Sequence, residues 1–282
     1  MAIKIERITG IARSLNFKYP TNRAIIIIVA SAFLLGTLVQ VLLDSTFSES
    51  IIWAFGAAGS VFFSWALARE LDPDHNASAF ISVAFVVPTL FFANLPTLLV
   101  LVWFLVIIRI LNRITGITPT LLDLVVIIVL AVVLSWQVMW LYGLLTSLVL
   151  YVNQSMDGKG KQCVLLSMII IPLVILSILL GNTDLVTVEM SSGTTIATAA
   201  ITLLFIPVIF LTDTVQSLTD VTGELVPTFR LRIARTIAVV TGSLVVITQG
   251  NHGFYDLLPL WSAITGVILN FLYRKLIGLR VP

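Results

Sequence analysis

Residues 69 to 80 read RELDPDHNASAF and place one Arg, three acids and one His within seven positions. The rest of the chain is nearly free of charge, so this stretch is the first place to look for chemistry. Carboxylates beside an imidazole can serve as general acids and bases, and carboxylates are ligands that Mg²⁺ prefers. We therefore predict Asp72, Asp74 and His75 as candidate catalytic residues.

Two later stretches, 109–123 and 213–235, carry further Arg, Asp and Asn residues. Arg binds phosphate oxygens through its planar fork of N–H groups, and Mg²⁺ neutralises charge on the same oxygens. The residues predicted to bind a phosphate-bearing substrate are Arg69, Arg109, Arg113 and Asn112. The candidate ligands for Mg²⁺, the one cofactor that we expect, are Asp72, Asp74, Asp213 and Asp220.

The first stretch also has a structural interpretation. Asp72 precedes a proline, and such a residue disfavours the α conformation, so a helix would end there. Asn76 or Ser78 would then cap the next helix. A third alternative is that Asp72 and Asp74 form ion pairs with Arg109 or Arg113. These alternatives remain open at the level of sequence.

The composition indicates which class of protein has to position these residues. The chain has 282 residues, of which 59% are hydrophobic and 11% charged, and its mean hydropathy is +1.09. Soluble domains carry about 25% charged residues, so this chain could not cover a water-facing surface. We predict an all-α, polytopic integral membrane bundle. The single Cys163 excludes an internal disulfide.

The chain divides into a basic N-terminal segment, 1–23, and a single transmembrane domain, 24–282. The apolar run that begins at residue 24 is about membrane-length and lacks a small-residue cleavage site, so we interpret it as an uncleaved first span. About ten spans are predicted, and they are 24–43, 51–68, 78–93, 97–112, 121–135, 137–152, 162–180, 194–212, 234–250 and 256–274.

Two of the apolar runs, 78–112 and 120–152, are too long for one ordinary crossing, and we predict that each folds as a tight helical hairpin. With ten spans, all sixteen Lys and Arg residues fall on one side. The positive-inside rule makes that side cytoplasmic. Both termini are then cytoplasmic, in the plasma or inner membrane. Helical spacing of Val215, Leu218 and Val221 in the longest internal cytoplasmic loop predicts a short interfacial helix there.

The first functional hypothesis is a polar site at the cytoplasmic face that acts on a lipid or a phosphate-bearing substrate. Membrane lipids are the expected partners, and no nucleic acid is expected. One alternative is a small-solute transporter, because ten spans with short loops resemble the drug/metabolite transporter layout. Its path would involve Gln40, Tyr142 and Asn270. The other alternative is a non-catalytic subunit of a membrane complex. Ionisable residues are absent from the middle of the predicted spans, which argues against ion-coupled transport.

Overall fold

A computed structural model of the chain describes residues 9–13, 15–91, 95–157, 171–172, 174–175, 178–179 and 189–278. Nine labelled helices lie in these ranges: α1 (Pro20–Leu42), α2 (Phe47–Leu71), α3 (Asn76–Thr89), α4 (Leu98–Asn112), α5 (Leu121–Gln137), α6 (Leu141–Asp157), α8 (Ser192–Leu211), α9 (Thr228–Asp256) and α10 (Leu258–Ile277). The only β pairing in the described ranges is one isolated bridge. The predicted all-α class is confirmed for them.

Several helix ends follow from local sequence. Thr46 and Glu49 form a reciprocal capping box at the start of α2, and Thr120 and Asp123 form another at the start of α5. Each box satisfies backbone N–H groups that a helix start otherwise leaves unpaired. Helix α2 ends at Leu71, immediately before the predicted Asp-Pro break.

Four described helices, α1, α2, α8 and α9, are long and apolar enough to cross a membrane. Helices α3, α4 and α5 are apolar but shorter, with 14, 15 and 17 residues. These lengths and compositions agree with a helical membrane protein. The predicted span 162–180 lies almost entirely outside the described residues.

Each of the two long apolar runs divides into two helices, as predicted. Helices α5 and α6 pack against each other as a hairpin, but α3 packs against α10 and α2, whereas α4 packs against α9 and α2. The prediction of a tight hairpin for 78–112 is therefore wrong. One reason is Gly266 in α10, where a Cβ atom would lie 2.5 Å from the carbonyl oxygen of Ser78. This glycine allows α10 to approach α3 closely.

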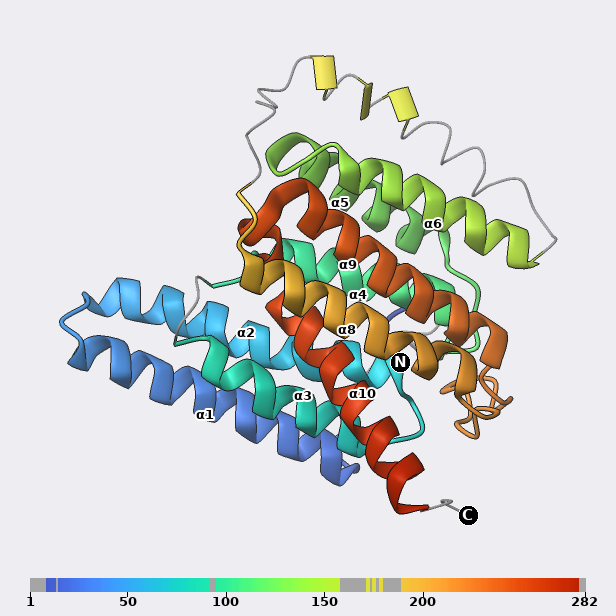
Figure 1. Cartoon of the computed structure of the whole chain (residues 1–282), viewed down its shortest axis with the longest axis horizontal. Coiled ribbons are helices and arrows are strands. Elements are labelled where there is room, and N and C mark those ends of the chain that lie inside the picture. The colour runs from blue at the N-terminus through green and yellow to red at the C-terminus, as the bar shows by residue number, and fades with distance from the viewer. Residues whose placement is uncertain are drawn as a thin grey trace, which may run out of the picture.

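Helix α4 lies near the centre of the bundle. In Figure 1, α4, α8 and α9 lie between α1–α3 on one side and α5 and α6 on the other, while α10 crosses near α3. Trp103 and Phe104 of α4 are fully buried, and Trp103 packs edge-on against Tyr142 of α6 at 5.0 Å between ring centroids. The largest core cluster is thus built around α4.

The loop between α8 and α9 contains no helix, so the predicted interfacial helix is wrong. Leu218 and Leu225 form a β-bridge instead, and Gly223 adopts a positive φ of 69° in the turn between them. The turn docks on the loop after α4: the N–H of Asp220 donates to the carbonyl of Ile114 at 2.9 Å. Backbone pairing thereby outweighs the helical spacing of the apolar side chains and brings Asp220 beside α4.

Candidate functional site

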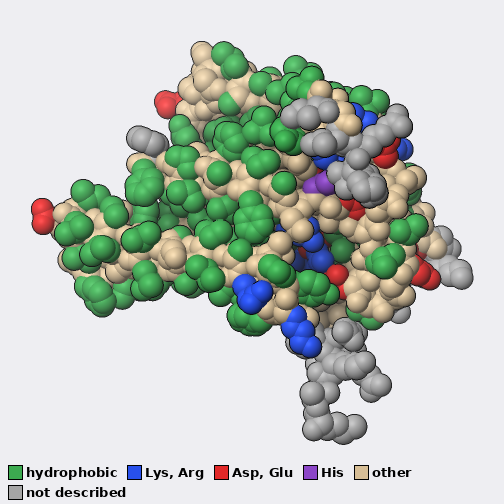
Figure 2. All heavy atoms as spheres, turned by 90° about the horizontal axis from the view of Figure 1, so that it is seen from below, with side chains coloured by type: hydrophobic (Ala, Val, Ile, Leu, Met, Phe, Trp, Pro, Cys, Tyr) green, Lys and Arg blue, Asp and Glu red, His purple; other side chains and the backbone are tan. Residues whose placement is uncertain are grey.

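Charged side chains from distant parts of the chain gather at one end of the bundle, which we call the arginine-rich end. It comprises the C-terminal ends of α2, α4, α6, α8 and α10 and the N-terminal ends of α3 and α9. Ion pairs there join α2 to α4 and join α4 and α9 to α6. The face in Figure 2 is largely hydrophobic, and its Lys, Arg and His side chains lie away from the protruding tip of α1 and α2.

Glu70 is the most enclosed acid at this end, with 1% of its side chain exposed. Its carboxylate accepts from the Nε of Arg109 at 2.9 Å, from Nη1 of Arg13 at 3.1 Å and from Nδ2 of Asn112 at 2.9 Å. A buried carboxylate is stable only when paired and hydrogen-bonded. Glu70 therefore fixes two guanidinium groups at one place.

The N-terminal segment, described at residues 9–13 and 15–19, lies across the arginine-rich end. The N–H of Gly10 donates to Asp123 Oδ2 at 2.7 Å, and Thr9 also hydrogen-bonds that carboxylate. Arg13 makes a bidentate pair with Asp220, with Nε–Oδ2 at 2.6 Å and Nη2–Oδ1 at 3.1 Å. The loop before α9, the N-terminal segment and α2 are thus held together through one arginine.

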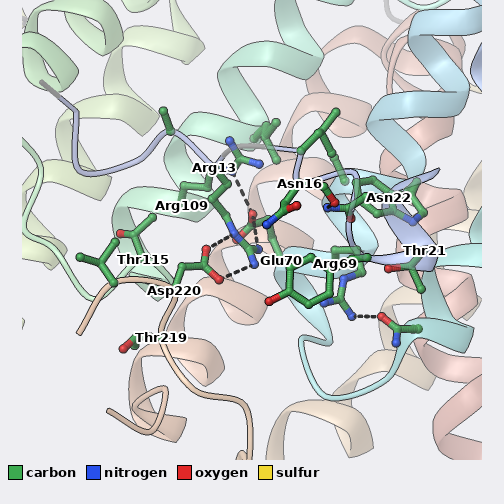
Figure 3. A pocket seen from close by; sticks show the side chains of 18 of the residues that line it. Arg13, Asn16, Thr21, Asn22, Arg69, Glu70, Arg109, Thr115, Thr219 and Asp220 are labelled. Atoms are coloured by element: carbon green, nitrogen blue, oxygen red, sulfur yellow. Dashed lines mark hydrogen bonds and ion pairs between the residues drawn. The ribbon is translucent and has the colours of Figure 1, made fainter. Parts of the chain in front are cut away.

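A cavity of about 940 Å³ opens between this segment, α2, α4 and the loop before α9. Its charged lining residues are Arg13, Arg69, Glu70, Arg109 and Asp220. In Figure 3, Arg13 and Arg109 converge on Glu70, and dashed lines join Arg13 to Asp220. The aromatic and large aliphatic lining residues are Leu15, Tyr19, Phe62, Trp65, Leu105, Leu218 and Val221. The cavity therefore combines an excess of positive charge with apolar surface.

Arg69 differs from the other two arginines of the cavity. Its Nη1 donates to Asn76 Oδ1 at 2.6 Å and to the carbonyl of Pro73 at 3.2 Å. Among the described residues, no carboxylate forms an ion pair with Arg69. Neutral acceptors hold the guanidinium in place, and the nearby acids Glu70, Asp72 and Asp220 act on it only at longer range. Among the three arginines of the cavity, it is the one without a direct ion pair to a described acid.

Asp72 and His75 form a separate cluster between α2, α3 and α10. His75 Nδ1 lies 2.9 Å from Asp72, and its Nε2 lies 2.7 Å from Nη1 of Arg274. Because Arg can only donate, Nε2 must accept and Nδ1 must carry the proton. Both ring nitrogens are thus engaged, one with Asp72 and one with Arg274.

Asp72 is 4% exposed and also accepts hydrogen bonds from Ser78 and from Asn270, the latter at 3.3 Å. Burial raises the pKa of Asp72, but the hydrogen bonds from His75 and Ser78 and the charge of Arg235 outweigh it, so the pKa lies below its ordinary value. Asp72 is therefore an ionised anchor that connects the turn after α2 to α10.

The four predicted Mg²⁺ ligands have separate partners. The Asp74 carboxylate accepts from the N–H of Ser217 at 2.8 Å and from its hydroxyl at 2.6 Å, while Asp213 lies 3.6 Å from Lys275. Asp220 pairs with Arg13 and Asp72 with His75. Across the described ranges no three His, Cys, Asp or Glu side chains are grouped closely enough to hold a metal ion.

The predicted substrate-binding residues also lie at different places, and only two of the four line the cavity. Arg69 and Arg109 line the cavity, and Asn112 lies behind it with its amide donating to Glu70. Arg113 pairs with Asp157 instead. The expected ion pairs from Arg109 or Arg113 to Asp72 or its neighbour Asp74 do not form, because other acids lie closer to both arginines.

The three residues expected on a transport path lie in different surroundings. Asn270 donates to Ser78 Oγ at 2.8 Å, Gln40 hydrogen-bonds Ser45 at 3.2 Å, and Tyr142 packs against Trp103. Trp103 in turn donates its indole N–H to Thr146 at 2.8 Å. The contacts of Asn270 and Tyr142 join neighbouring helices, whereas Gln40 contacts the loop that follows its own helix, so the three residues do not outline a common path.

Known proteins offer a second way to interpret such a cavity. Comparison with protein-family models, curated proteins and solved structures finds no match for this chain. The chemistry of the cavity residues is the basis for the function proposed below.

The residues of the arginine-rich end that were not predicted as site residues from the sequence include Arg13, Glu70, Asp157 and Arg230. Glu70 lies inside the charged stretch, in the last turn of an apolar helix. That position was the available signal that its side chain could be buried. Arg13 pairs with acids 57 and 207 positions away. No local pattern indicates contacts at such separations.

Proposed function

We propose that the chain is a ten-span protein of the plasma or inner membrane, with both termini and the arginine-rich end in the cytoplasm. Four long apolar helices support a membrane location, and the described Lys and Arg residues lie in loops or near helix ends that the ten-span topology assigns to one side. Such a bias in Lys and Arg sets orientation in membranes. The tenth helix of this topology is the predicted span 162–180.

Cysteine labelling tests this topology. In a Cys163→Ser background, a membrane-impermeant maleimide added to intact cells should label Ser48→Cys, at the start of α2, and leave Glu224→Cys unlabelled. Both positions are exposed, so access depends on the side of the membrane alone. Labelling of Glu224→Cys in intact cells would show that the orientation is reversed.

We further propose that the cavity at the arginine-rich end binds a lipid with a phosphate-bearing headgroup. The observation that carries this proposal is Arg69, a cation that lines the cavity and has no acidic partner among the described residues. Arg is the side chain best suited to phosphate oxygens because it presents several N–H donors in one plane. The lining arginines exceed the lining acids by three to two, which favours an anion.

The apolar part of the same cavity favours a lipid over a free anion. Phe62 and Leu105 belong to α2 and α4, and they provide surface on which an acyl chain would be removed from water. A volume of about 940 Å³ is at the upper end of the range for small-molecule sites, about 300–1,000 Å³. The headgroup would lie at Arg69 and the chain along the aromatic wall.

Lipid binding to the purified protein tests this function. Arg69→Gln should lower the affinity for short-chain phosphatidic acid by about tenfold or more, the effect of losing roughly 1.4 kcal/mol. Arg23→Gln makes the same change of charge at an exposed site in α1 outside the cavity lining, and it should bind like the wild type. Calorimetric titration gives the dissociation constants.

Two further ligands show whether the phosphate that binds belongs to a lipid headgroup or is a free anion. Diacylglycerol, which lacks the phosphate, should bind at least tenfold more weakly than phosphatidic acid. Inorganic phosphate, which lacks the chains, should also bind weakly. Tight binding of inorganic phosphate would show that the ligand is a free anion and not a lipid. Equal affinity of Arg69→Gln and the wild type for phosphatidic acid would overturn the site.

A further inference from the structure

One face of α2 forms a graded wall of the cavity. Phe62, Trp65, Ala66 and Arg69 all line it, and their spacing of three, four and seven residues places them on the same side of the helix. With a rise of about 1.5 Å per residue, Trp65 lies about 6 Å from Arg69 along the helix axis. The wall therefore passes from charged to aromatic over a little more than one turn.

Trp65 carries an unused hydrogen-bond donor on this wall. Its side chain is 7% exposed, and its indole Nε1 has no partner among the described residues. Trp103, in the neighbouring helix α4, shows the usual situation, because its Nε1 donates to Thr146 at 2.8 Å. A buried N–H without an acceptor is costly, so an acceptor supplied by a ligand would be favourable.

We infer that the ligand is an ester-linked phospholipid, with its phosphate at Arg69 and an acyl ester carbonyl accepting from the Trp65 indole N–H. The glycerol carbons separate the phosphate from the ester carbonyls by a few bonds, a length comparable to one helical turn. The Trp65 Nε1 atom is buried, so the indole would have to rotate on ligand binding for its N–H to meet that carbonyl. Phe62 would then contact the acyl chain beyond the ester. This inference rests on the proposed phosphate-lipid function and specifies its substrate class.

The choice of an ester follows from acceptor chemistry. A carbonyl oxygen is a strong hydrogen-bond acceptor with two lone pairs. The oxygen of an ether-linked lipid accepts weakly, and an isoprenyl phosphate has hydrocarbon at this depth. The indole N–H thus distinguishes ester lipids from the other two classes, since only an ester satisfies it well.

The test compares two lipids and two variants by calorimetric titration of the full-length protein. The lipids are dioctanoyl phosphatidic acid and its dioctyl ether analogue, which differ in the carbonyls. Trp65→Phe keeps an aromatic ring and removes the N–H. Trp261→Phe is the matched control, because the Trp261 indole is also buried and without a partner among the described residues but does not line the cavity.

The wild type and Trp261→Phe should bind the ester lipid about threefold to tenfold more tightly than the ether lipid, the range expected for one hydrogen bond. Trp65→Phe should lose this preference through weaker ester binding, while its ether binding stays unchanged. A preference retained in Trp65→Phe, or an equal loss for both lipids, would overturn the inference. Equal binding of both lipids by the wild type would also overturn the inference, but it would leave the phosphate site intact. Equal affinity of Arg69→Gln and the wild type for phosphatidic acid would instead overturn the phosphate site itself.

Discussion

Replacing Glu70 with Gln is expected to destabilise the protein by about 3–5 kcal/mol, the usual cost of removing one partner from a buried ion pair. Glu70 is 1% exposed and accepts from Arg13, Arg109 and Asn112. Once its charge is removed, Arg109 has no acid within ion-pair distance in the described part of the chain. The free energy of unfolding, from denaturant titration of the solubilised protein, measures the effect.

A matched control and a second variant make the Glu70 prediction specific. Glu224→Gln changes an exposed acid in the loop before α9 and should alter stability by less than about 0.5 kcal/mol. Adding Arg109→Met to Glu70→Gln should recover part of the loss, because it removes a charge left without a partner. If Glu70→Gln and Glu224→Gln are equally stable, the buried pair does not contribute as described.

Replacing Asp157 with Asn is expected to cost about 3 kcal/mol, the lower end of the range for a buried pair, because its side chain is 23% exposed. The Asp157 carboxylate pairs with Arg113 and with Arg230. Both arginines also donate to Asn153 Oδ1, each at 3.2 Å. Loss of the shared charge leaves two neighbouring guanidinium groups that repel, which should loosen the end of α6 from α4 and α9.

Asp213→Asn provides the comparison for Asp157. Asp213 is 91% exposed and lies 3.6 Å from Lys275, so its substitution should change stability by about 1 kcal/mol at most. A double-mutant cycle between Asp157→Asn and Arg230→Gln should give a coupling energy of about 0.5–3 kcal/mol. Additive effects of the two substitutions would contradict the ion pair.

The two clusters connect stability to the proposed binding site. Glu70 holds Arg13 and Arg109 at the wall of the cavity, so their guanidinium groups are positioned before a ligand arrives. Arg69 is held by Asn76 in the same way but forms no direct ion pair with a described acid. A positioned cation loses little freedom when an anion binds, which favours affinity. The same buried acid therefore supports both the fold and the cavity.

Much of the fold was predictable from local patterns. The strong excess of apolar residues indicated a helical membrane protein, and the described ranges are helical with four membrane-length helices. The Asp-Pro pair marked the end of α2, because proline restricts the residue before it. The cap predicted at Asn76 or Ser78 is wrong: α3 begins at Asn76, and its N-cap is His75, which makes no side-chain capping hydrogen bond. The splitting of both long apolar runs followed from helix length together with the positive-inside rule, because single tilted crossings would place Arg109 and Arg113 on the outer side. The ten spans and their orientation remain proposals.

The partners of the charged residues could not be predicted in this way. Arg109 pairs with Glu70 across 39 positions and Arg113 with Asp157 across 44, whereas the sequence suggested Asp72 or Asp74 for both. Neither separation leaves a local signal. The grouping of the four acids predicted to bind Mg²⁺ could not be judged from the sequence for the same reason, since each acid has a different partner in the fold.

The amino-acid sequence was enough to predict the all-α class, the end of α2 and the concentration of Lys and Arg in a few segments, because these depend on composition and short-range geometry. The tertiary structure decided which helices are neighbours. In a membrane protein, the helix faces toward lipid and toward the bundle are both apolar, so hydrophobic periodicity does not reveal packing partners. Close approach at Gly266 and the buried charge of Glu70 select them instead.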